Sequence, residues 1–197
     1  MKNKGLNKLQ KQTSNKMIII SEQQPKKHAE ISILNKHEFL YKTITPIDNT
    51  TKSNSKYMLG FNMKGQRKNS AENMQISALK IVIQNSKTKD WEEFIKKILL
   101  CNLSYSLFET QKHDPKRNKC YGIAIFPLHT CIKATLIKSA TKQLLKYLHI
   151  KDVKKFKINL KQSCNPTLKI EYPYTRGEYF LGYAIYEQPD FEYTSME

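Results

Sequence analysis

Apolar and polar positions follow their most regular pattern between residues 79 and 128. An apolar, β-branched run is followed by a polar break, which predicts a strand that ends at the surface. Behind Asp90, which can cap a helix, apolar side chains recur at helical spacing, and two alternating segments follow. The pattern therefore predicts a strand, a helix and two further strands at residues 79–83, 91–99, 103–108 and 121–126.

The rest of the chain mixes the same two patterns. Apolar residues at helical spacing predict a second helix within residues 132–148, and residues 31–47 fit either a helix or a strand. Short strands are predicted at residues 57–61, 155–160, 167–172 and 178–186. The Lys-, Asn- and Gln-rich residues 1–16 predict a disordered basic tail ahead of a single domain, residues 17–197. The expected class is α+β, with a mixed sheet and packed helices.

Between the last two strands of the regular region, residues 111–119 form a polar turn that collects one imidazole and several cations. Lysine is a flexible point charge that suits contact with phosphate better than the reading of bases. We therefore expect function at this turn, and the candidate nucleotide- or nucleic-acid-binding residues are Lys112, His113, Lys116, Arg117 and Lys119.

The order of these elements, with Thr110-x-x-His113-x-Pro115 in the turn and Pro127 and Leu128 after the last strand, resembles a known family. It is similar to the archaeo-eukaryotic-type primase (primase-polymerase) domain of phage and plasmid replication proteins, over half to two thirds of the chain. The resemblance implies a primase-polymerase-like (RRM-like) core. It also implies that His113 contacts nucleotide phosphates.

The chain departs from that family where metal would bind. The family's first strand ends in Asp-x-Asp, and those positions carry Val82 and Gln84 here, or Ile83 and Asn85 after a shift of one residue. Residues 161–164, where a third acid is expected, also lack a carboxylate. Magnesium needs hard oxygen ligands, and two-metal catalysis needs carboxylates. We therefore predict degenerate metal positions, no bound metal and no polymerase chemistry. The decisive structural observation is whether Val82 or Gln84 faces His113 across an open cleft, and whether any acid reaches that cleft.

Charge supports an anionic partner. The chain has 197 residues, 34 Lys and Arg against 17 Asp and Glu, a net charge of +17 and a pI near 9.6. A+T-rich coding explains the preference for Lys over Arg, but it also predicts extra Glu, so it explains the excess of base less well. We expect sequence-nonspecific, salt-sensitive binding, most simply to single-stranded DNA. The preference between DNA and RNA stays open.

The cysteines, the apolar runs and the chain length indicate the compartment and the number of domains. Cys101, Cys120, Cys131 and Cys164 are widely spaced without a paired C-x-x-C arrangement, which argues against zinc and suits a reducing cytoplasm. No apolar run is long enough to predict a membrane span or a signal core. A chain of this length holds one domain, so a helicase that acts with it would be a separate chain.

Three functions remain open. The preferred one is a non-catalytic, primase-like domain that binds nucleic acid or nucleotide in the replication or maintenance of a plasmid, phage or other mobile element. The second is an active primase-polymerase with relocated acids, which alone would use Mg²⁺ as a cofactor. The third is an interaction or virulence-associated protein that has reused the fold.

Overall fold

The computed structural model describes residues 16–21, 31–44, 55–62, 74–110, 112–170, 182–185 and 187–195. These residues form helices and antiparallel strands, so the α+β class is confirmed. The predicted basic tail lies outside the described residues except for Lys16, where the first strand begins. No helix in the described part of the chain is long and apolar enough to cross a bilayer.

The central sheet has five strands in the order β4, β5, β7, β6 and β9. The outer strands β4 (Gly60–Asn62) and β9 (Gly182–Ile185) are short, whereas β5 (Met74–Ser86) and β7 (Cys120–Lys133) are long, and β6 (Tyr105–Glu109) lies between β7 and β9. Every pairing between these strands is antiparallel, so the mixed sheet that the sequence suggested is corrected to an antiparallel one in the described part.

The connections of this sheet give an RRM-like topology. Helix α3 (Thr88–Leu99) links β5 to β6, and β7 returns between those two strands before α4 (Ile137–Tyr147) begins. After α4 the chain comes back to β5 on the side that pairs with β4 near residues 74–76, and there Ile158 forms an antiparallel bridge with Ile83. The order of strand, helix, two strands and helix, with the third strand central, is that of the split β-α-β arrangement, and the single bridging residue Ile158 takes the place of its last strand. The strand order therefore agrees with the RRM-like core.

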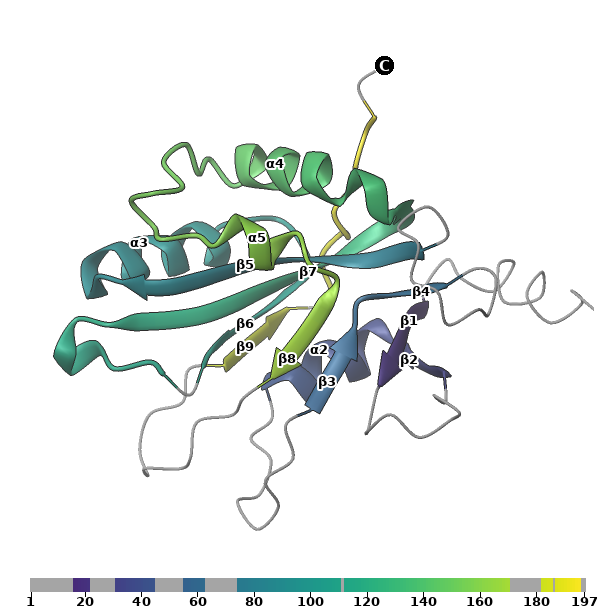
Figure 1. The fold of residues 1–197 in the computed structure, drawn as a ribbon, viewed down its shortest axis with the longest axis horizontal. Helices are drawn as coiled ribbons and strands as arrows, with labels where there is room; N and C mark the ends of the chain where they lie inside the picture. The colour runs from purple at the N-terminus through teal and green to yellow at the C-terminus, as the bar shows by residue number, and fades with distance from the viewer. Residues whose placement is uncertain are drawn as a thin grey trace, which may run out of the picture.

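Helices α3 and α4 cover one face of this sheet (Figure 1). Because side chains alternate across a strand, Ile81 and Ile83 of β5 and Ala124 and Phe126 of β7 share this face. Helix α3 contributes residues at helical spacing, so the larger core forms between the helices and the sheet, with Trp91, Phe94 and Ile98 from α3 and Ala140, Leu144 and Leu145 from α4.

The second layer lies against the other face (Figure 1). It contains α2 (Lys36–Ile44) and a four-stranded antiparallel sheet in the order β2, β1, β3 and β8. The strands are β2 (Ile31–Asn35), β1 (Lys16–Ser21), β3 (Ser55–Met58) and β8 (Thr167–Ile170). A smaller core fills this interface, and its members include Phe39, Leu40, Ala78, Val82, Phe108, Ile123, Ile125 and Leu168.

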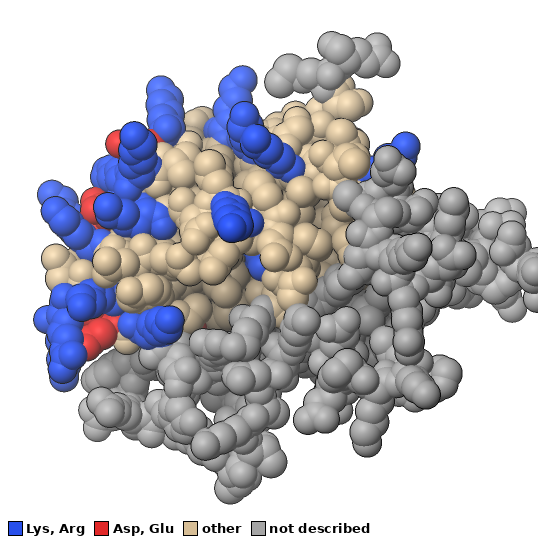
Figure 2. All heavy atoms as spheres, in the orientation of Figure 1, with Lys and Arg blue, Asp and Glu red and all other residues tan. Residues whose placement is uncertain are grey.

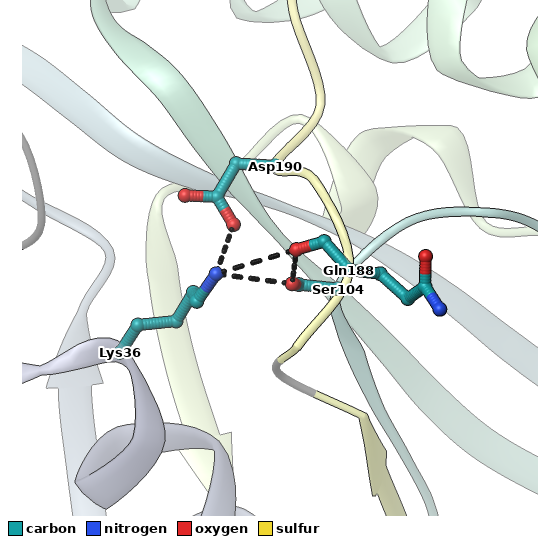
Figure 3. Close-up of polar contacts among 4 residues, drawn as sticks. All are labelled: Lys36, Ser104, Gln188 and Asp190. Carbon is teal, nitrogen blue, oxygen red and sulfur yellow. Dashed lines mark hydrogen bonds and ion pairs between the residues drawn. The ribbon is translucent and has the colours of Figure 1, made fainter.

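A polar clamp fastens α2 to the segments that precede β6 and follow β9 (Figure 3). Lys36, the first residue of α2, places Nζ 2.9 Å from Oδ1 of Asp190 and 3.1 Å from Oγ of Ser104. The same Nζ donates to the carbonyl of Gln188 at 3.5 Å, and the Ser104 hydroxyl also donates to that carbonyl. Three segments far apart in the sequence therefore meet at one ammonium group.

Two predicted elements differ from the structure. The predicted strand at residues 155–160 is wrong, because residues 153–157 form turns, only Ile158 bridges to the sheet, and α5 (Leu160–Ser163) follows. The predicted helix at residues 132–148 begins later, since Ile132 and Lys133 pair with β5 and a 3-10 turn, Ala134–Leu136, precedes α4. At residues 132 and 133, pairing with β5 extends the strand and delays the start of the helix.

Candidate nucleic-acid interface

The turn between β6 and β7 is tightly hydrogen-bonded. Asp114 and Lys119 pair through two backbone bonds of 2.7 and 3.0 Å, and they enclose the 3-10 turn Pro115–Arg117. The Asp114 carboxylate accepts the backbone N–H of Arg117 at 3.2 Å. Asn118 closes the turn in the left-handed region, with φ of 56°, which asparagine tolerates better than most residues. The backbone that carries the basic side chains is thus held in one shape.

This turn also caps α3. Lys87 occupies the N-cap position but makes no side-chain capping bond, and Asp90, the predicted cap, lies within the first helical turn. Instead, Oδ1 of Asn118 accepts the backbone N–H of Thr88 at 2.7 Å, and the Thr88 hydroxyl donates to the carbonyl of Pro115 at 3.1 Å. An N–H group that would lack a partner at the helix start is satisfied by the turn. Helix and turn therefore stabilise each other.

The four basic side chains of the predicted site are brought together on this turn. Lys112, Lys116, Arg117 and Lys119 are all exposed. Arg117 is 80% exposed and has one carboxylate partner, with Nε 3.4 Å from Oδ2 of Asp114. A single weak, exposed ion pair leaves the turn with an excess of positive charge.

His113 has a different environment, with a side chain only 6% exposed. Its Nδ1 lies 3.2 Å from the backbone nitrogen of Tyr121, and its Nε2 lies 3.0 Å from Oε1 of Glu109. The imidazole also packs edge-on against Trp91, with ring centroids 5.5 Å apart. Both ring nitrogens therefore have partners inside the protein, and the ring fixes the turn to the helix-covered face of the sheet.

Val82 and His113 lie on opposite faces of the central sheet. Val82 is 6% exposed and belongs to the smaller core, with Ile123 as its neighbour on β7. Gly122, the next residue along β7, points to the opposite face, where a Cβ would meet Trp91 at 2.2 Å. Trp91 is the ring that packs against His113. Val82 therefore does not face His113.

Gln84 and the segment around residue 162 do come together. Nε2 of Gln84 donates to Oε1 of Gln162 at 2.8 Å, and Nδ2 of Asn159 donates to Oε1 of Gln84 at 2.7 Å. Asn159 is also the N-cap of α5, where its Oδ1 accepts the backbone N–H of Gln162 at 3.0 Å. The backbone N–H of Val82 donates to the Ser163 hydroxyl at 3.0 Å. Gln84, Asn159 and Gln162 thus share one network of neutral amides.

Such a network offers only neutral oxygen atoms, and each amide oxygen already accepts a hydrogen bond. Divalent ions in phosphoryl-transfer sites are held by carboxylates. Among the described residues, no group of three or more His, Cys, Asp or Glu side chains is placed to hold a metal ion.

Lys80 is a polar residue on this side of the sheet that the sequence did not single out. It lies two residues before Val82 on β5, is 5% exposed and donates through Nζ to the carbonyl of Thr167, the first residue of β8. Burial lowers the pKa of Lys80 to about 8. Its only sequence signal was a charged residue inside an apolar run, between Leu79 and Ile81.

Two further contacts at this site were not predicted from the sequence. The pairing of Glu109 with His113 follows i,i+4 spacing, but the two residues belong to a strand and a turn, where such spacing predicts no contact. The Asn159-x-x-Gln162 pattern is a recognisable helix start that could have indicated α5.

Basic side chains extend beyond the turn. Figure 2 shows Lys and Arg gathered over α3, α4 and the end of the sheet where β7 begins, with few carboxylates between them. Part of this charge is neutralised, since Nζ of Lys155 lies 2.5 Å from Oε2 of Glu93 on α3. The turn is thus one end of a larger positive surface.

Comparison with protein-family models and with curated proteins gives no match. Among solved structures, the chain is similar to the AEP domain of the primase-polymerase of cyanophage S-2L. The two share 13% sequence identity with a TM-score of 0.38, over 91% of this chain and 85% of that chain. At that level the similarity carries no functional weight.

Proposed function

We propose that this protein binds nucleic acid through the basic turn between β6 and β7, without catalysing nucleotidyl transfer. The observation that carries the proposal is the turn itself, in which Lys112, Lys116, Arg117 and Lys119 are exposed on a backbone held by Asp114, Asn118 and α3. A role in the replication or maintenance of a plasmid, phage or other mobile element belongs to the same proposal and rests on the motif resemblance.

A rigid basic turn suits phosphate contact. The side chains would neutralise phosphates while the turn itself does not need to become ordered, which lowers the entropy lost on binding. The buried His113 positions the turn in this proposal through Glu109 and the Tyr121 backbone, rather than contacting phosphate. Since lysines dominate, we expect little discrimination between base sequences.

The amide network supports the non-catalytic part of the proposal. Gln84 and Gln162 lie where the family resemblance places acids, and they contact each other instead of holding a charge. A templated primer-synthesis assay with Mg²⁺ or Mn²⁺ tests this part, and no product is expected. Metal-dependent synthesis that is lost in His113→Ala would instead establish the active primase alternative.

The binding experiment is a fluorescence anisotropy titration with labelled single-stranded oligonucleotides of several sequences. The double variant Lys116→Glu/Arg117→Glu should bind at least about tenfold more weakly, because two phosphate contacts at about 1 kcal/mol each become repulsive. The loss should be similar for every sequence.

Lys138→Glu/Lys142→Glu on α4 is the matched control, because both residues are exposed and both variants lower the net charge equally. It should lose much less affinity than the turn variant. An equal loss in both variants would mean that overall charge, not the turn, drives binding, and unchanged binding in the turn variant would remove the proposed interface.

A further inference from the structure

A pocket of about 760 Å³ lies between the last turns of α3 and α4. The end of α3 contributes Lys97, and Leu100 and Cys101 follow it, while α4 contributes Lys146 and Tyr147. The opposite end of α3 is the one capped by the basic turn. A helix of this length spans about 18 Å, so pocket and turn are separate surfaces.

The pocket has an unusual share of exposed apolar side chains. Leu100 is 82% exposed and Tyr147 is 46% exposed. They are two of the seven large apolar residues that are exposed in the described part of the chain. One edge of the Tyr147 ring packs against Phe191, with centroids 6.1 Å apart, which fixes the ring in place. Two exposed apolar side chains in one pocket make it a candidate for contact with a partner.

The charge of the pocket is one-sided. Lys97 reaches across it and donates through Nζ to the carbonyl of His149 at 3.3 Å, and Lys146 is exposed on the α4 wall. None of the residues that line the pocket, all of them within the described ranges, is an aspartate or glutamate. Lysines near helix ends complement the helix dipole, but the dipole gives no reason for the exposed Leu100. Apolar walls and a cationic rim occur together here.

We propose that this pocket binds an acidic peptide segment of a partner protein. In that complex an apolar side chain of the peptide would lie between Leu100 and Tyr147, and neighbouring carboxylates would contact Lys97 and Lys146. Single strands stack on aromatic rings, and the Tyr147 ring in this pocket already packs against Phe191, whereas the exposed, aliphatic Leu100 suits an apolar side chain of a peptide. The proposal does not depend on nucleic-acid binding at the turn, because the two sites lie at opposite ends of α3.

The test is an NMR titration of the ¹⁵N-labelled full chain with a short synthetic peptide in which a run of glutamates precedes a phenylalanine and a leucine. At millimolar peptide, amide shifts should change at residues 97–102 and 146–149 and stay unchanged at residues 112–119. Replacing the glutamates by glutamines, or the two apolar residues by serines, should abolish the changes.

Leu100→Ser and Lys146→Glu should each weaken the peptide about tenfold, since each removes one of the two kinds of contact. Their matched controls are Leu160→Ser, another exposed leucine, and Lys138→Glu, at the other end of α4, and both should bind like the wild type. Because Leu100 is so exposed, its replacement should leave the fold intact.

Three outcomes would overturn the proposal: no shift at the pocket, peptide binding that is unaffected by Leu100→Ser, or displacement of the peptide by oligo(dT) from the pocket. The last result would assign the pocket to nucleic acid. Failure at the turn in the oligonucleotide titration would leave the peptide result unaffected, so the two proposals can fail separately.

Discussion

Gln84 and Gln162 are neutral amides at positions where two carboxylates could bind a metal ion. Nε2 of Gln84 donates a hydrogen bond of 2.8 Å to Oε1 of Gln162, and this contact needs no ion. As glutamates, the same pair would repel each other unless a cation lay between them. The amide pair therefore favours a site that is stable without metal.

We expect Mg²⁺ to leave the melting temperature of the wild-type protein almost unchanged. The variant Gln84→Glu/Gln162→Glu should melt at a lower temperature in EDTA, because two carboxylates replace a hydrogen-bonded pair, and Mg²⁺ should recover part of that loss. Thermal melts followed by circular dichroism in EDTA and in millimolar Mg²⁺ measure both effects, with the single variant Gln162→Glu as control. A large, saturable rise in the wild type would contradict the assignment.

Lys80 gives a pH dependence whose sign can be stated. The charged form is disfavoured in the folded protein, where burial lowers the pKa of Lys80 from 10.5 to about 8. Below pH 8 the folded state therefore carries the full penalty, and the penalty is relieved as the pH rises toward 10.5. A shift of this size corresponds to roughly 3 kcal/mol.

Denaturant unfolding of the wild type and of Lys80→Met between pH 7 and 10.5 tests this effect. The stability of the wild type relative to the variant should increase as the pH rises above 8. The lost bond to the Thr167 carbonyl shifts the difference by a constant and does not change its slope. Lys161→Met, an exposed lysine on α5, is the control. A difference that stays flat with pH would show that Lys80 does not titrate in this range.

For single residues of the turn, the sequence predicted the exposed Lys and Arg side chains but not the burial of the His113 ring. Polar neighbours on both sides of His113 predicted a residue at the surface. The ring is buried because Trp91 and Glu109 reach it from another helix and from the preceding strand. Contacts of this kind depend on how distant segments pack, which local polarity does not report.

Among the elements, α3 and the turn form the pair on which the proposed interface depends. Asn118 supplies both the left-handed backbone of the turn and the oxygen that accepts the N–H of Thr88. The two contributions can be separated by substitution, because glycine keeps the conformational freedom and loses only the side-chain bond.

Asn118→Gly should lower the free energy of unfolding by about 1 kcal/mol, the usual contribution of a helix cap. Asn118→Ala should lower it by about 2 kcal/mol, because it also strains the left-handed residue by about 1 kcal/mol. Urea unfolding measures the free energy of both variants. Equal stability of the glycine variant and the wild type would show that the cap contributes nothing.

The sequence predicted most of the central sheet at the level of elements because its periodicity is strong. Strand β5, helix α3 and strand β6 lie close to the expected positions. The segment at residues 155–160 was predicted as a strand because Phe156, Ile158 and Leu160 alternate with polar residues. A left-handed Lys157, with φ of 55°, and the Asn159 cap interrupt that pattern. Backbone conformations at single residues override an alternation this short.

In the whole molecule, both proposed sites lie on the helix-covered side of the central sheet, at opposite ends of α3. The clamp at Lys36 fastens the second layer to the central sheet, while α3 and α4 on the opposite face carry much of the described basic surface (Figure 2). If both proposals hold, one chain can bind nucleic acid at the turn and a protein partner at the pocket at the same time. The protein would then link the partner to the nucleic acid.

The salt dependence of binding distinguishes a protein that binds nucleic acid at the turn from one that binds only other proteins. For single strands the slope of log affinity against log salt is about −0.7 for each neutralised phosphate. Four contacts, from Lys112, Lys116, Arg117 and Lys119, therefore predict a slope of about −3. In Lys116→Glu/Arg117→Glu at least two contacts disappear, so the slope should fall to about half.

Anisotropy titrations with oligo(dT) and with mixed-sequence strands, from low to physiological salt, give these slopes. Affinities for the two strands should agree within a few fold, because phosphate contacts carry no sequence information. Binding that is nearly independent of salt would favour the interaction protein, since counterion release accompanies any contact between these cations and a nucleic acid. A wild-type slope that the turn variant shares unchanged would place the phosphate contacts on another part of the basic surface, with the lysines of α3 and α4 as the next residues to reverse.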